Sequence, residues 1–411
     1  MRRLGLIVLL IVFSTIKLFA KDGVNIEWYG FVHNQMFIDD RKSLQGAQGL
    51  YNLIPLDIKE DVDGNDLNEQ MDLTFLSITS RIGMNLSGPE LLGAATSGKI
   101  EADFSAASGA TPLFMLRQAN VVMNWKKSRL LIGQTWHPMS GEIFPEVIGI
   151  SMGAPFNPFN RSPQLRVDYY LFDKNQLALT AAYIYQGQYA SYGPEGRSNK
   201  YQRAAVTPAS YIGVSFQTGG FKVGIGTEVQ TLVPRTTAFT GTPNEVKVDE
   251  SIITLSGMIQ ASYVKDKLSL KTKTVWGEDM SHLGICSGYG VDGIHQDLVT
   301  RDYHPLTAVS SWVMGTYGKE WKVGLFGGYM SNLGSTTNYI SESMMYVYGG
   351  THIDKMYRVS PSISYNVANL QFAVEYERTS VAYGTMKGHG NVVDSHWVTN
   401  NRLLFSTLYN F

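Results

Sequence analysis

The connections between the alternating segments of this chain constrain its fold more than any other feature. Sixteen segments alternate apolar and polar residues with a period of two, which predicts strands with one apolar and one polar face. They are 26–38, 71–86, 98–106, 113–125, 128–138, 164–172, 176–187, 209–217, 221–231, 252–263, 268–276, 308–317, 321–331, 355–366, 370–378 and 400–410. From the fourth segment on, the even-numbered ones are followed by turns of two to four residues. The odd-numbered segments are followed by connections of 20 to 32 residues. Two connections are exceptions: six residues follow the third segment, and eleven follow the second.

This sorting of the connections predicts a closed barrel. In an antiparallel barrel, short turns gather at one end and long loops at the other, whereas a soluble sandwich has no reason to sort its loops. Within 164–172, Leu165 and Val167 share one face and Arg166 and Asp168 share the other, which fits a lipid-facing exterior and a polar lumen. Closure pairs every backbone donor and acceptor, as lipid requires. We therefore predict an all-β fold, a transmembrane antiparallel β-barrel of 16 strands with short periplasmic turns and long external loops.

The N-terminal residues predict export. Two arginines precede the apolar run 4–13, and Ala20 is a small residue suited to cleavage, so residues 1–20 form a predicted signal peptide and residues 21–411 a single barrel domain. No other stretch approaches the roughly 20 apolar residues that a spanning helix needs. Removal of the leader leaves 31 basic and 35 acidic residues, and this net charge of −4 does not suggest a nucleic-acid partner. The single cysteine, Cys286, cannot form an internal disulfide.

The last segment carries a further signal. One face of it holds Leu403, Phe405, Thr407, Tyr409 and Phe411. A terminal Phe with an aromatic residue two positions earlier resembles the C-terminal signature of bacterial outer-membrane barrels. This resemblance implies an integral protein of the outer membrane of a Gram-negative cell, in contact with lipid and lipopolysaccharide, whose Phe411 is recognised by the barrel-assembly machinery.

The connection 139–163 differs from the other loops. It is rich in apolar residues, Gly and Pro, and poor in the charges of a solvated loop, so we expect the third external loop to fold into the lumen and form a constriction. An apolar loop packed in a subunit contact is the alternative, because loops normally run over surfaces. Inside the lumen, Glu142 and Glu146 would face cations on the wall.

Arginines on neighbouring segments are the expected partners of these carboxylates. Arg81 and Arg166 have lumenal parity, and the parity of Arg117 is ambiguous. Arginines opposite acidic loop residues would set a transverse field across a narrow channel. The basic residues placed inside the wall outnumber the acidic ones by nine to six, which predicts either a mild preference for anions or a lumen that is merely solvated. The nine are Arg81, Lys99, Arg166, Lys222, Lys271, Lys273, Lys322, Arg358 and Arg402, and the six are Glu101, Asp103, Asp168, Glu228, Glu375 and Glu377.

Three stretches, Leu116–Trp125, Leu131–Trp136 and Arg161–Arg166, resemble the DcaP-like porins and, more loosely, the trimeric general porins. The resemblance implies a homotrimer whose third loop narrows the channel, with DcaP-like members admitting small carboxylates. Matching residues are Arg117, Gln134, Trp136, Arg161 and Arg166, whereas Arg81 rests on parity alone. DcaP-like porins carry a coiled-coil segment before the barrel, and here the first strand follows the predicted cleavage site closely. That departure weighs against a dicarboxylate preference and a helical trimerisation segment.

Catalysis and metal binding find little support. The chain has no H-E-x-x-H, and His33 and His137 are single histidines expected as lumenal or interface polar groups, so we predict no enzyme. Asp61, Asp63 and Asn65 have the alternating oxygen spacing that Ca²⁺ prefers but lack the other EF-hand positions. We expect a solvated acidic loop there, with calcium bridging of loops or lipopolysaccharide as the alternative. The loop 277–307 holds His282, Cys286, His295 and His304, whose spacing fits no standard zinc pattern.

These features together predict a porin that lets small hydrophilic solutes diffuse passively, with a mild preference for anions or carboxylates. The alternative is a structural or adhesive barrel whose long loops bind ligands while the lumen stays plugged. A substrate-specific channel is a narrower third option. Strands one to five have the least regular lipid face and are therefore the predicted subunit contact.

Overall fold

The computed structural model describes residues 23–46, 48–108, 111–172 and 176–411. The predicted signal peptide and the turn at 173–175 lie outside these ranges. The predicted closed barrel of 16 antiparallel strands is confirmed. The wall consists of β1 (Asn25–Asp39), β4 (Asp72–Leu76) with β5 (Arg81–Ser87) as one interrupted strand, β6 (Ala95–Ser108), β7 (Thr111–Asn124), β8 (Ser128–Trp136), β9 (Arg161–Leu171), β10 (Leu177–Ile184), β13 (Ala209–Thr218), β14 (Phe221–Leu232), β17 (Ile252–Lys265), β18 (Leu268–Glu278), β20 (Arg301–Gly318), β21 (Trp321–Gly334), β23 (Ile353–Val367), β24 (Leu370–Met386) and β25 (Val392–Asn410).

The first and last wall strands close the ring. β1 pairs antiparallel with β25 from Phe31 opposite Asn410 to Asp39 opposite Arg402. The seam ends with two reciprocal backbone hydrogen bonds of 3.1 Å between Gly30 and Phe411. On its other side, β1 pairs with β4 and β5, so no edge of the wall is left open.

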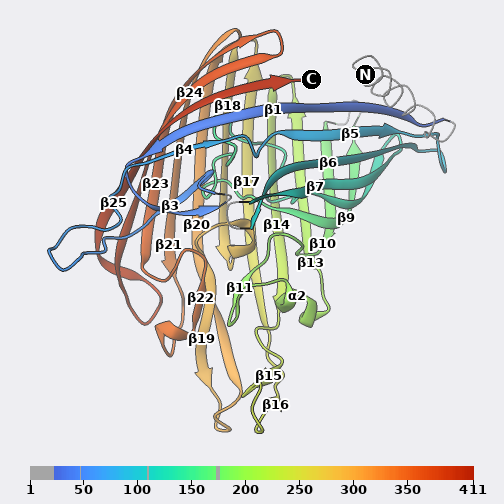
Figure 1. Cartoon of the computed structure of the whole chain (residues 1–411). Coiled ribbons are helices and arrows are strands. Elements are labelled where there is room, and N and C mark those ends of the chain that lie inside the picture. Colours follow the sequence, from blue (N-terminus) through green and yellow to red (C-terminus); the bar gives the residue numbers. More distant parts are fainter. Residues whose placement is uncertain (1–22, 47, 109–110, 173–175) are drawn as a thin grey trace, which may run out of the picture.

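Short turns and the C-terminus lie at one end of the barrel, and the long loops extend from the other end (Figure 1). The remaining elements belong to these loops or to extensions of the wall. They are β2 (Ser43–Gly46), β3 (Tyr51–Pro55), β11 (Tyr192–Gly193), β12 (Gly196–Arg197), α2 (Lys200–Ala205), β15 (Thr237–Ala238), β16 (Val246–Lys247), η3 (Ser281–Leu283), β19 (Gly288–Ile294), η4 (Glu342–Met344) and β22 (Met345–Val347). None of the helices in the described ranges is long and apolar enough to cross a bilayer.

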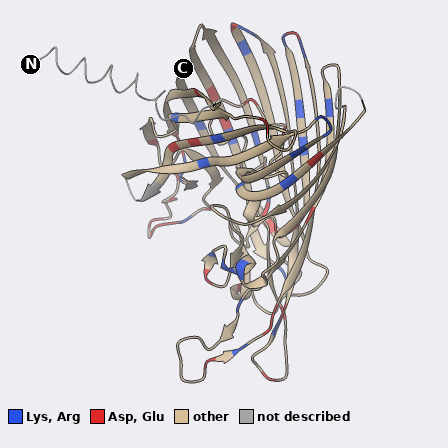
Figure 2. Ribbon diagram, turned by 90° about the vertical axis from the view of Figure 1, so that its right-hand side faces the viewer, with Lys and Arg blue, Asp and Glu red and all other residues tan. Residues whose placement is uncertain are grey.

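The outer surface is apolar, as the period-two pattern predicts. On β9, Leu165, Val167 and Tyr169 are exposed, while Asp168 between them is buried toward the lumen. In Figure 2, Lys, Arg, Asp and Glu form short bands on wall strands that are otherwise uncharged. Because large apolar side chains stay exposed along so many strands, the exterior suits a lipid environment.

The lumen contains more than the third loop, contrary to the sequence-based expectation. The hairpin of β2 and β3 in the first loop also packs inside, where Arg402 donates to the carbonyls of Leu50 at 3.1 Å and Gly49 at 2.9 Å. Ile54 of this hairpin joins an apolar core with the third loop and with inward-facing wall residues such as Phe326. The connection between β18 and β20, which we call the sixth loop, contributes to the same core. Part of the lumen is therefore a packed interior and not a uniformly wet channel.

Candidate pore constriction

The third loop spans residues 137–160 and crosses the lumen. Trp312 Nε1 on β20 donates to Asn157 Oδ1 at 2.9 Å, and Ser310 on the same strand donates to the carbonyl of Phe156 at 2.9 Å. The amide of Ile148 donates to Glu375 on β24 at 2.9 Å. Since its own barrel wall binds the loop at several strands, the predicted infolding is confirmed.

The loop ends earlier than the sequence suggests. The predicted range 139–163 includes residues 161–163, but these belong to β9, where Arg161 pairs with Trp136 of β8. The ladder continues through Ser162 and Pro163 because β8 offers matching partners. Pro163 pairs opposite Gln134, so this proline lies within the strand and not in the loop.

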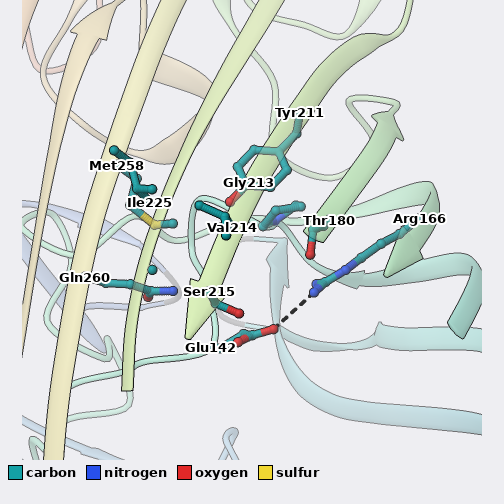
Figure 3. A pocket seen from close by; sticks show the side chains of 12 residues that line it. Glu142, Arg166, Thr180, Tyr211, Gly213, Val214, Ser215, Ile225, Met258 and Gln260 are labelled. Atoms are coloured by element: carbon teal, nitrogen blue, oxygen red, sulfur yellow. Dashed lines mark hydrogen bonds and ion pairs between the residues drawn. The ribbon is translucent and has the colours of Figure 1, made fainter. Parts of the chain in front are cut away.

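Glu142 joins the loop to two wall strands. Its carboxylate accepts from Arg166 Nη2 on β9 at 3.1 Å (Figure 3). It also contacts the Lys222 ammonium on β14. Arg166 also donates through Nε to Asp168 Oδ1 at 2.8 Å. Burial would raise the pKa of Glu142, but Lys222 and Arg166 outweigh it and lower the pKa.

Glu146 makes the matching contact farther along the loop. It binds Lys271 Nζ on β18 at 2.8 Å and the Lys322 ammonium on β21, and accepts from Ser269 Oγ at 2.7 Å. Burial alone would raise the pKa of Glu146, but hydrogen bonds from these groups lower it to about 2. We call the two carboxylates and their four cationic partners the loop seam.

A cavity of about 330 Å³ separates the loop from the opposite wall. On the loop side it is lined by Glu146 and apolar residues such as Ile148 and Met152, and on the wall side by Arg81 and Lys322. The two wall cations come from strands far apart in the sequence, Arg81 from β5 and Lys322 from β21. The space is large enough for a small hydrated solute and presents two cations and one carboxylate to it.

Arg81 and Arg117 form their ion pairs with carboxylates of the neighbouring strand β6 and not with the loop acids. Arg117 donates to Glu101 Oε1 at 3.0 Å and to Asp103 Oδ2 at 2.6 Å, and Arg81 lies 3.6 Å and 3.7 Å from the same two carboxylates. The reason is register, because Arg81 pairs directly opposite Asp103 on the neighbouring strand. We call these four residues the wall cluster.

The other residues taken from the family resemblance lie where the loop meets the wall. Arg161 is fully buried, donates to the Tyr189 hydroxyl at 2.8 Å and lies over the ring of Trp136 at 5.0 Å. Gln134 donates to the carbonyls of Leu116 at 3.0 Å and Arg117 at 3.1 Å. These contacts brace β7, β8 and β9 at the base of the loop.

The acidic first loop forms a compact turn at the predicted calcium candidates. Asp61 Oδ1 accepts from the amides of Asp63 at 2.8 Å and Asn65 at 2.9 Å, and Asp61 Oδ2 accepts from Asn65 Nδ2 at 3.0 Å. Donors from the same turn thus satisfy the Asp61 carboxylate. The solvated acidic loop stays the prediction, with calcium bridging as its untested alternative.

Sequence reasoning missed the cationic partners of the loop and a second polar group beside it. Lys222, Lys271 and Lys322 had readable lumenal parity, but nothing in the sequence connects them to Glu142 and Glu146. His137, placed among isolated histidines, lies at the start of the loop together with Glu228 and His282. The alternation along a strand predicts whether a side chain faces the lumen or the lipid. Which loop residue it contacts depends on where the loop lies in the lumen.

No family model and no curated protein matches the sequence. Solved structures do match. The outer membrane channel DcaP of Acinetobacter baumannii has a TM-score of 0.70 at 18% identity, covering 95% of this chain and 99% of that chain. The trimer form of OmpT, an outer membrane protein of Vibrio cholerae, has a TM-score of 0.53 at 13% identity, covering 95% and 100%. OmpF of Salmonella typhi in complex with daunomycin has a TM-score of 0.50 at 11% identity, covering 95% and 98%. The fold of this chain is therefore the fold of outer-membrane channel barrels.

Proposed function

We propose that this protein is an integral outer-membrane porin of a Gram-negative cell that admits small hydrophilic solutes by passive diffusion. The observation that carries the proposal is the cavity between the third loop and the wall, whose mixed lining includes the charged groups of Arg81, Lys322 and Glu146. An infolded loop of this kind narrows a 16-stranded barrel without sealing it. The likeness to DcaP supports the same conclusion at the level of the fold.

The loop seam supports a mild preference for anions, including small carboxylates. Two loop carboxylates face four cations, and among the residues that the structure describes only Arg166 of these has another carboxylate partner, Asp168. Arg81 adds positive charge on the far side of the cavity, although Glu101 and Asp103 partly compensate it. An anion passing the loop thus meets a small excess of positive charge.

We further propose a homotrimer that forms through the outer face of β1 and β4 to β8, the first five strands of the wall. Like the rest of the outer wall, this face exposes large apolar side chains, among them Trp28, Phe75 and the adjacent pair Phe104 and Phe114. The matching OmpT structure is a trimer form. Contact with lipopolysaccharide around the loops and recognition of the exposed Phe411 by the assembly machinery belong to the same proposal.

Planar-bilayer recording of the purified, folded protein tests the proposal. We expect stepwise, ohmic conductance, and we expect liposomes containing the protein to swell in small sugars, amino acids and dicarboxylates. Ranking these solutes by swelling rate would define the substrate class. A folded protein that inserts into the bilayer but gives no conductance steps would overturn the porin proposal.

A plugged structural or adhesive barrel is the second candidate, favoured by the apolar core inside the lumen. In that core, Ile54 of the first loop packs with Ile143 of the third loop and Ile285 of the sixth loop. If this core closes the channel, the intact protein conducts no current, and deletion of the β2–β3 hairpin, residues 43–55, opens it. Conductance of the intact protein favours the porin.

A further inference from the structure

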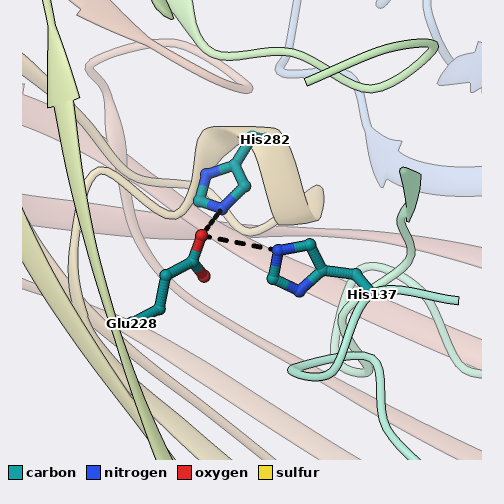
Figure 4. A group of neighbouring side chains, drawn as sticks. All are labelled: His137, Glu228 and His282. Atoms are coloured by element: carbon teal, nitrogen blue, oxygen red, sulfur yellow. Dashed lines mark ion pairs between the residues drawn. The ribbon is translucent and has the colours of Figure 1, made fainter. Parts of the chain in front are cut away.

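Three buried polar side chains from separate parts of the chain meet beneath the start of the third loop. His137 is the first residue of that loop, Glu228 lies on β14, and His282 lies in η3 of the sixth loop. Their exposed fractions are 1%, 1% and 3%. Figure 4 shows both imidazoles directed at the same carboxylate oxygen: Glu228 Oε1 lies 3.4 Å from His137 Nε2 and 3.3 Å from His282 Nε2.

The group lacks the hydrogen bonds that a buried carboxylate normally has. Within the described part of the chain, neither Nε2 atom and neither Glu228 oxygen has a partner with hydrogen-bond geometry. Charge-assisted hydrogen bonds between nitrogen and a carboxylate are typically about 2.7–2.9 Å long, so these contacts are too long. An unsatisfied, buried carboxylate is costly, and a cation among the three side chains would remove that cost.

The spacing fits a metal ion. Zinc binds imidazole nitrogen at about 2.0–2.1 Å and carboxylate oxygen at about 2.0–2.2 Å in a tetrahedral arrangement, which puts neighbouring ligand atoms roughly 3.3–3.5 Å apart. The two nitrogen–oxygen distances agree with this edge length, and all three ligand atoms lie within 4.8 Å of one another. We propose that His137, Glu228 and His282 form a site for a divalent transition-metal ion of the zinc type. Two His and one Glu make up a known zinc ligand set that leaves a fourth position for water.

A further carboxyl group and a cavity lie next to these three side chains. Asp279 is buried beside His282 and interacts with it electrostatically, and its Oδ2 has no hydrogen-bond partner among the described residues. His282 also lines a cavity of about 170 Å³ together with Arg197 and Tyr348 of the external loops. An ion could therefore reach the site from the loop end of the barrel.

The other ring nitrogens show what metal binding must change. The Met139 amide donates to His137 Nδ1 at 3.1 Å, and Gln230 Nε2 lies 3.4 Å from His282 Nδ1. These contacts place the proton of each neutral imidazole on Nε2, whereas a metal on Nε2 requires the proton on Nδ1. Metal binding thus shifts both tautomers and breaks the hydrogen bond from Met139. Uptake of the ion is in this way coupled to the first turn of the third loop.

Metal binding by the untagged, folded full-length barrel in detergent tests this inference, which does not depend on the proposed porin function. After chelation and dialysis, we expect one Zn²⁺ per chain by calorimetry, and visible absorption typical of tetrahedral coordination when Co²⁺ replaces Zn²⁺. We expect H282Q and E228Q to lower the affinity by at least about 100-fold, because loss of an outer-shell partner alone costs 10- to 100-fold.

The control is H295Q, which changes an exposed histidine paired with Asp302 at 3.0 Å and should bind Zn²⁺ as the unaltered protein does. Added Zn²⁺ should also raise the thermal unfolding midpoint of the unaltered protein and of H295Q, but not that of H282Q. The inference is overturned if the unaltered protein binds no Zn²⁺ and gives no Co²⁺ absorption. Circular dichroism verifies that each variant is folded. If folded H282Q and E228Q bind Zn²⁺ as tightly as the unaltered protein, the inference is overturned too.

Discussion

The wall cluster and the loop seam use the same residue types in different environments. Side chains of the wall cluster are at most 15% exposed, and those of the loop seam range from 12% to 38%. Removing one partner from a buried pair leaves an uncompensated charge, whereas a hydrated pair contributes little to stability. The comparison teaches that charges in this lumen divide into those that hold the wall together and those available to a passing solute.

The largest effect should come from breaking the wall cluster. Arg117→Met leaves Glu101 and Asp103 with the more distant Arg81 as their one cationic partner among the described residues, beside hydrogen bonds from neutral donors. We expect a loss of about 3–5 kcal/mol in the free energy of unfolding. Denaturant titration of the protein refolded into lipid vesicles measures this loss. Lys222→Met in the loop seam is the matched control and should cost less than about 1 kcal/mol. Equal losses in the two variants would remove the distinction between the two regions.

Neutralising the loop carboxylates should change ion selectivity more than stability. Glu146→Gln leaves Lys271 and Lys322 without a carboxylate partner. Glu142→Gln leaves Lys222 without one, while Arg166 keeps Asp168. The permeability ratio should therefore shift toward anions by a few fold. Reversal potentials across a salt gradient measure this ratio, with Glu60→Gln in the acidic first loop as the control. Unchanged reversal potentials in both loop variants would reject their place in the conduction path.

A smaller effect concerns pH. The pKa of Glu146 is lowered to about 2 by its partners, from an ordinary value of about 4.3. Because the folded-state pKa is the lower one, the stabilisation is complete above about pH 4.3 and is lost as pH falls toward 2. Between pH 7 and pH 4 the contribution of Glu146 to selectivity should stay constant, which is measured as the difference from Glu146→Gln. A transition in this difference near pH 4.5 would show that the contacts with Lys271 and Lys322 do not form.

The smallest effect should come from Arg129, which lies 3.5 Å from Asp168 and is about one-third exposed. Asp168 keeps its hydrogen bonds from Arg166 at 2.8 Å and Thr180 at 2.7 Å. Arg129→Ala should therefore change the free energy of unfolding by less than about 1 kcal/mol. Vesicle refolding checks this value, and a loss comparable with that of Arg117→Met would place Arg129 in the wall cluster.

The sequence predicted the wall because its signal is local. Alternation along β9, from Leu165 to Tyr169, follows from a two-residue period, and the sorted connections follow from an antiparallel ring. The predicted ends of strands were less accurate where the strands continue beyond the membrane. For example, β20 begins at Arg301, whereas the predicted strand begins at 308. Here the pattern weakens because both faces meet water or other loops.

The site was less predictable because its contacts join distant segments. The composition of the third loop indicated its infolding, but Glu146 finds Lys322 only after the ring has closed. The same holds for His137 and His282, which are 145 positions apart by their numbers and meet through the placement of two loops. The polar composition of the first loop likewise concealed the burial of Ile54.

The seam between β1 and β25 has a consequence for how the protein matures. Its nine paired positions join the first and last strands of the wall. Until β25 arrives, β1 lacks one neighbour, and its unpaired amides and carbonyls cannot enter hydrocarbon at acceptable cost. The wall is therefore complete only when this seam has closed, and we expect a variant weakened at the seam to be more open to proteases and to aggregation before it enters the membrane.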